Sequence, residues 1–255
     1  MKNFHEIMPT MLLVLATWWM SSCRMSVSVN TKKVEASDEM IQEKRVTHDF
    51  TVLNVAGPLV VEYIQGGIEV LPHIDIEGPD NIVELIEVNE DGEEVTVKVK
   101  DGCEIDLGDK TLLVKAYSSR LDELSMAGSG KVIVDDFTQM SDLDVNSAGS
   151  GHIQIEKLQL QGNLAVSIAG SGSLDAEGVV CHKVKTDLAG SGNIRMKDIQ
   201  AQQLKASVSG SGEMKLSGHA DEANYEVVGS GHIDARTMVA ERNDKTVTGS
   251  GRVEL

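Results

Sequence analysis

The sequence predicts an all-β fold built as a parallel β-solenoid, and three observations indicate it. The tripeptide Gly-Ser-Gly occurs seven times in the second half of the chain, with first glycines 21, 21, 20, 20, 19 and 20 residues apart. Polar and apolar residues alternate after each triplet, as they do in a strand with one buried face. Nothing repeats at the spacing of a helix. A fixed period of this length is typical of coils that bury their apolar sides against one another.

The chain begins with a segment that is expected to direct export. Lys2 precedes an apolar run from Ile7 to Met20, which is too short to span a bilayer as a helix, and small residues lead to Cys23. This pattern, residues 1–23, resembles a bacterial lipoprotein signal, in which the cysteine is lipidated and becomes the mature N-terminus. An ordinary secretory signal with an incidental cysteine is the alternative. Residues 24–46 are polar without apolar periodicity and are predicted to form a flexible tether.

Residues 47–120 are predicted to form an acidic β-rich region that caps or continues the coil stack at its N-terminal end. Strand-like runs, including residues 82–88, are separated by Gly and Pro, and Asp91-Gly92 between two alternating runs predicts a hairpin. An end of a solenoid exposes unpaired strand edges, which is why a cap is expected there. At the other end the last coil has no such region after it, so an open edge and weak self-association are a further hypothesis.

Residues 121–255 contain the repeats, and each repeat is expected to hold two or three short strands with tight corners between them. After the first strand, a third apolar position recurs at Phe137, Leu158, Val179, Ile199 and Met238. Glycine adopts positive φ without steric cost, so the triplet glycines are expected to be structural turns. These glycines are Gly128, Gly130, Gly149, Gly151, Gly170, Gly172, Gly190, Gly192, Gly210, Gly212, Gly229, Gly231, Gly249 and Gly251. A phosphate loop is the alternative, but it needs a following helix, and strands follow here.

Charge and cysteine content limit the partners and cofactors. The chain has a net charge of −17, and residues 49–109 alone hold sixteen acids against two bases. This acidity argues against nucleic acid as a partner and leaves a lipid anchor as the only expected contact with a membrane. The three cysteines imply no disulfide framework, and no spaced ligand set indicates a metal or another cofactor. The acidic turn at residues 90–94 lacks the ligand spacing of a calcium loop.

The whole arrangement resembles a known family. Residues 50–57, 61–66 and 80–86, followed by serial Gly-Ser-Gly coils, are similar to the auto-transporter adhesin head GIN domain family, a domain of unknown function common in Bacteroidota. The resemblance covers about residues 47–255. It implies a right-handed β-helix in an exported, often lipid-anchored protein, and it supplies no catalytic residues.

Two classes of function fit the sequence. The first is a non-enzymatic envelope lipoprotein at the outer membrane, adhesin-like, that binds an extended glycan or protein along a regular rod. The second is a polysaccharide lyase or glycosidase, because β-helices often host these activities. It would need paired carboxylates, and the candidates are Asp135, Asp136, Asp144 and Asp175. Asp175 is expected to lie beside Arg195, and long loops that would wall a cleft are missing, so the first class is favoured and no catalytic residue is assigned.

Overall fold

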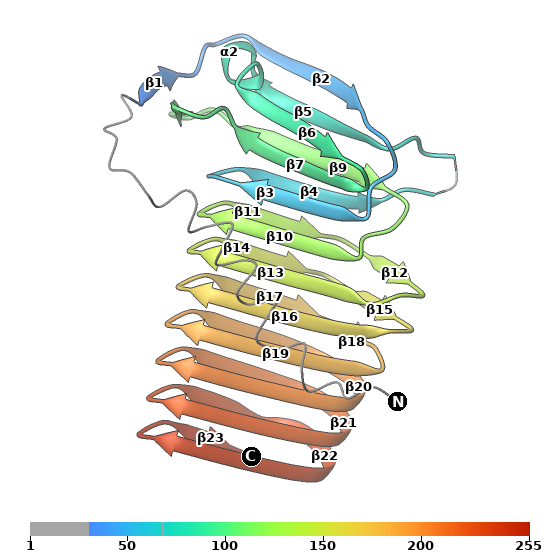
Figure 1. Ribbon diagram of the computed structural model, residues 1–255, viewed down its shortest axis with the longest axis vertical. Helices are drawn as coiled ribbons and strands as arrows, with labels where there is room; N and C mark the ends of the chain where they lie inside the picture. The colour runs from blue at the N-terminus through green and yellow to red at the C-terminus, as the bar shows by residue number, and fades with distance from the viewer. Residues whose placement is uncertain (1–30, 68) are drawn as a thin grey trace.

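The computed structural model describes residues 31–67 and 69–255, and these form an all-β rod of stacked coils with a cap of antiparallel strands (Figure 1). The predicted fold class is confirmed. Twenty-one strands belong to one continuous sheet, and the N-terminal strands join it. One short two-stranded sheet, of β1 (Lys32–Glu35) and β8 (Cys103–Asp106), lies beside the cap.

Each coil has three sides, which we name A, B and C in chain order after the corner. Side A contains β4 (Val60–Gln65), β11 (Lys131–Val134), β14 (His152–Ile155) and β17 (Ser173–Glu177). Side B contains β12 (Phe137–Gln139), β15 (Leu158–Leu160) and β18 (Val179–Val180). Side C contains β3 (Val52–Ala56), β10 (Glu123–Gly128), β13 (Leu143–Gly149), β16 (Asn163–Gly170) and β19 (Lys183–Gly190).

In the later coils one strand runs through all three sides. These strands are β20 (Asn193–Gly210), β21 (Glu213–Gly229) and β22 (His232–Gly249), and β23 (Arg252–Glu254) adds a last piece of side A. Neighbouring coils pair in parallel and nearly in register, so equivalent residues form columns. The inward columns make up a single core along the rod.

The third apolar position of the repeat is one of these inward columns, as expected. Phe137 pairs with Leu158 and Leu158 with Val179. Further along the rod, Ile199 pairs with Gly218 and Gly218 with Met238. The outward partners that the repeat predicted are also side by side, with Arg195 Nη1 at 2.8 Å from Asp175 Oδ1.

The cap continues both main sides of the coil stack and then reverses strand direction. On side A, β9 (Leu113–Ser118) pairs in parallel with β4, and then β5 (His73–Pro79) and β2 (Met40–Val46) follow antiparallel. On side C, β7 (Glu94–Val99) pairs in parallel with β3, and β6 (Ile86–Asp91) follows antiparallel. The predicted hairpin at Asp91-Gly92 joins β6 and β7. A one-turn helix, α2 (Asp80–Val83), crosses from β5 to β6.

Two expectations about the N-terminal half were wrong. The tether predicted for residues 24–46 is not a tether from residue 32 onward, because β1 pairs with β8 and β2 pairs with β5. The strand-like run at residues 82–88 is split between α2 and β6, since the chain must turn there from side A to side C. The signal segment, residues 1–23, and Cys23 lie outside the described residues.

Candidate functional site

The Gly-Ser-Gly triplets lie at the corner between sides C and A, one above another along the rod. The first glycine of each triplet has positive φ, for example 116° at Gly170, where an added Cβ would lie 2.6 Å from the carbonyl oxygen of Gly149. The backbone N–H of Ser171 donates to that same oxygen at 2.9 Å. Corner backbones therefore touch from coil to coil, which explains the glycines without a bound ligand. A strand, not a helix, follows each triplet.

The polar side chains on side A include a serine, a histidine and an aspartate in contact. Ser173 Oγ lies 2.8 Å from His152 Nδ1, and His152 Nε2 lies 3.7 Å from Asp175 Oδ2. This is the set of groups that a nucleophilic hydrolase uses. Such a centre also needs free backbone N–H groups for the oxyanion, and here the N–H of Ser173 donates to Gly151 within the parallel ladder. With Arg195 also bound to Asp175, the cluster is a ladder that joins three coils.

Sequence reasoning paired Asp175 with Arg195 but missed the contact of His152 with Ser173. The signal was present in the period, because both residues directly follow a triplet in successive repeats.

The four candidate carboxylates of the enzyme hypothesis do not converge. Asp135 and Asp136 lie in the turn between β11 and β12, Asp144 points outward from side C, and Asp175 points outward from side A. Burial, and then the neighbouring carboxylate of Glu123, raises the pKa of Asp144. A raised pKa fits a general acid, but a glycosidase needs a second carboxylate across a cleft, and these aspartates lie on different sides.

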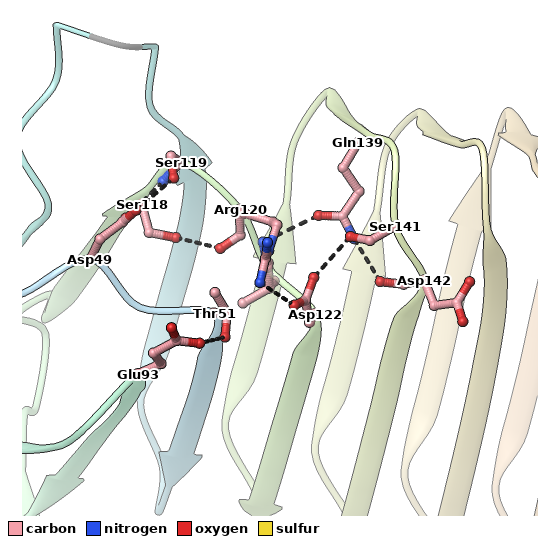
Figure 2. Close-up of polar contacts among 11 residues, drawn as sticks. Asp49, Thr51, Glu93, Ser118, Ser119, Arg120, Asp122, Gln139, Ser141 and Asp142 are labelled. Atoms are coloured by element: carbon pink, nitrogen blue, oxygen red, sulfur yellow. Dashed lines mark hydrogen bonds and ion pairs between the residues drawn. The ribbon is translucent and has the colours of Figure 1, made fainter.

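A polar network joins the cap to the first Gly-Ser-Gly coil (Figure 2). Arg120, in the segment that leads from β9 into β10, forms an ion pair with Asp122 at 2.8 Å, and Ser141 Oγ donates to Asp122 at 2.9 Å. Ser119 Oγ donates to Asp49 at 2.8 Å. These bonds tie the crossing segment to the chain on either side of it.

Gln139 completes this junction from inside β12. Its Oε1 accepts from the backbone N–H of Leu121 at 3.3 Å, and its Nε2 donates to the carbonyl of Asp142 at 2.7 Å. The side chain is buried, and it forms hydrogen bonds with backbone groups that strand pairing leaves without a partner. Sequence reasoning missed it because a glutamine in a mostly apolar column carries no periodic signal. We interpret the junction as structural.

The described residues provide no group of three or more His, Cys, Asp or Glu that could hold a metal ion. Cys103, in β8, and Cys181, after β18, are both free thiols. Burial raises the pKa of Cys181 to about 11, so this thiol stays protonated and unreactive at neutral pH. Within residues 31–67 and 69–255, no helix is long and apolar enough to cross a membrane.

The family model described as "Putative auto-transporter adhesin, head GIN domain" matches residues 49–182 and 164–255. The chain belongs to this family. The two matched segments overlap and together run from the start of the cap's parallel strands to the last coil. No curated protein matches the sequence.

Three solved structures share the fold of this head GIN domain. A "putative adhesin" of Bacteroides fragilis has a TM-score of 0.74 and 21% identity, covering 86% of this chain and 98% of that one. A "putative adhesin" of Parabacteroides distasonis has a TM-score of 0.70 and 19% identity, over 88% and 99%. A "putative lipid binding protein" of the same species has a TM-score of 0.67 and 22% identity, over 87% and 98%. At these identities the likeness concerns the fold.

Proposed function

We propose that this protein is an exported, lipid-anchored binding module of the cell envelope, adhesin-like and non-enzymatic, whose rod presents flat sides to an extended glycan or protein. The observation that carries the proposal is a column of small outward side chains along side C, in a chain whose family is described as a putative adhesin. Ala127, Ala148, Ala169 and Ala189 form one outward column, in register from β10 to β19. This column is an evenly spaced strip of small side chains along four coils, which suits an extended ligand better than an enclosed substrate.

The anchor would lie at the cap end of the rod. With Cys23 lipidated, only residues 24–31 separate it from β1, and eight extended residues reach at most about 29 Å. The cap is therefore held close to the membrane, and β20, β21 and β22 lie at the opposite end of the rod (Figure 1). The short connection follows from the pairing of β1 with β8.

Metabolic labelling with a palmitate analogue tests the anchor. We expect label in the native chain and in Cys181→Ser, and no label in Cys23→Ser, which should also leave the membrane fraction. Label that persists in Cys23→Ser would contradict the assignment.

Protease access to the coils tests the position in the envelope. We expect cleavage on intact cells of the host, detected with antibody against residues 47–255, with lysed cells as the reference. Protection until lysis would contradict an adhesin-like role at the surface and would favour a binding partner in the periplasm.

A further inference from the structure

The regular stacking of coils is broken on side B near the end of the rod that lies away from the cap. The register between β20 and β21 shifts between Met196 and Ile199, and the register between β21 and β22 shifts between Lys215 and Ser217. Asp198, at the first shift, has a φ of 53°, and Lys157 and Gly178 at the equivalent positions of the two preceding coils also have positive φ, so this backbone conformation belongs to the repeat. The pairs between β12, β15 and β18 on side B show no register shift, so the two shifts in neighbouring coils define one irregular region.

Gly218 lies at the same place and can hardly be replaced by a larger residue. It stands in the column between Ile199 and Met238, has a φ of 131°, and a Cβ there would lie 2.2 Å from the carbonyl oxygen of Ile199. The strand backbones approach each other closely as a result. The neighbouring coils have a large apolar side chain at this position of the repeat, and Gly218 has none.

A surface depression of about 610 Å³ coincides with these irregularities. Its polar lining consists of Asp198, Gln200, Gln202 and His219, and the buried Cys181 and Ile199 lie beneath. All four polar residues are exposed. Among the described residues, no hydrogen bond or ion pair engages their side chains.

The chemistry of this lining selects among ligands. Each glutamine amide offers both a donor and an acceptor, the imidazole of His219 offers the same, and the carboxylate of Asp198 accepts. Neighbouring sugar hydroxyls need this mixture, since each hydroxyl both donates and accepts. No Lys or Arg lines the depression, which disfavours phosphates and polyanions. One carboxylate is too few for a calcium ion.

A peptide strand is also disfavoured, because the backbone groups in the floor are already paired. Val180 pairs with Gln200, Gln200 with His219, and His219 with Val239, so no free strand edge is presented there. We propose that this depression is a binding site for a neutral glycan, held by Gln200, Gln202, His219 and Asp198. The inference rests on the proposed function, since it names a ligand class for the binding module and places its site at the end away from the anchor.

Binding of the full-length protein to an array of immobilised neutral glycans (mannans, glucans, galactans and chito-oligosaccharides) tests the site, with polygalacturonate and heparin as anionic references. Gln200→Ala and His219→Ala each remove hydrogen bonds to the ligand and should weaken binding about tenfold. Gln159→Ala is the matched control, because Gln159 is an exposed glutamine of the same outward column, two coils away and outside the depression. All three variants should have the melting temperature of the native chain, since none of these side chains has a hydrogen-bond partner in the described structure.

We expect retention of a neutral glycan by the native chain and by Gln159→Ala, and about tenfold weaker binding of that glycan by the other two variants. Retention of anionic glycans alone, equal loss in Gln159→Ala, or no retained neutral glycan would overturn the inference. The proposed function has separate outcomes. If the chain is exposed on the cell surface but binds through another side, the inference fails and the proposed function stands. If the chain is found inside the cell, the proposed function fails even if the depression binds sugar.

Discussion

The two ends of the coil stack are finished in different ways. At the N-terminal end, antiparallel strands β5, β6 and β2 cover the parallel ladder. At the other end, β22 keeps the parallel register but changes its side chains. Asn243 and Lys245 occupy inward positions of side C, where the preceding coil has the buried Ala223 and Tyr225.

Both solutions meet the same physical problem, which is an apolar column and a strand edge that the described residues leave without a further coil. Redirecting strands takes a separate region of the chain, whereas the last coil exchanges two of its three inward side chains on side C and keeps Val247, which is 41% exposed. A charged inward residue such as Lys245 makes pairing with another strand costly because the charge would have to be buried. These residues weigh against the self-association that a bare edge would favour.

The largest effect should come from the middle of the stack, between the two ends. Gly170→Val places a branched side chain at positive φ and against the carbonyl of Gly149, so we expect a loss of about 3 kcal/mol or more of unfolding free energy. Gly67→Ala is the control, because nothing lies within 4 Å of its added Cβ. Thermal melts of both variants make the comparison, and an unchanged melting temperature for Gly170→Val would contradict the corner assignment.

The cap should be weakened by removing a single arginine. Arg45 donates to the carbonyls of Val83 and Ile86, and so joins β2 to the chain that crosses between the cap's two sides. Arg45→Ala leaves these carbonyls without their donor and should cost about 1–3 kcal/mol. Lys44→Ala, one residue earlier and more exposed, should cost little because its contact with Asp75 is 3.9 Å long. Urea unfolding of the two variants checks this, and equal losses would contradict it.

A local effect is expected in the coil that contains Gly218. This coil lacks the large inward side chain that Ile199 and Met238 supply in the neighbouring coils, so less apolar surface is buried there. Hydrogen exchange should be faster in the middle of β21 than in the middle of β20. Equal or slower exchange in β21 would contradict this expectation.

The smallest effect should be electrostatic. The pKa of Asp144 is raised in the folded state, so folding favours its neutral form, and stability falls as the pH rises from the pKa of an unfolded aspartate through the higher pKa of the folded state. Asp144→Asn should therefore stabilise the protein at neutral pH, by about a few tenths of a kcal/mol because the group is partly exposed to solvent, and have no effect in acid below the pKa of an unfolded aspartate. Asp221→Asn, at an exposed position, is the control. A loss of stability at pH 7 in Asp144→Asn would contradict the sign.

How much of this could be predicted depended on the repeat. The Gly-Ser-Gly period determined the coils, the column of Phe137 and its equivalents, and the pairing of Asp175 with Arg195, because a fixed offset in sequence becomes a contact between coils. The cap has no period, so its strand order and the role of residues 32–46 could not be derived from local pattern. The depression on side B could not be predicted from the sequence either, since it depends on register shifts that appear only when coils are stacked.

The most direct test of the two-ended account is sedimentation of the native chain beside the double variant Asn243→Val and Lys245→Val. We expect the native chain to stay monomeric with rising concentration and the double variant to associate, because its two new valines would extend the apolar column at the exposed end of the stack. A native chain that associates, or a double variant that remains monomeric at the same concentrations, would contradict it.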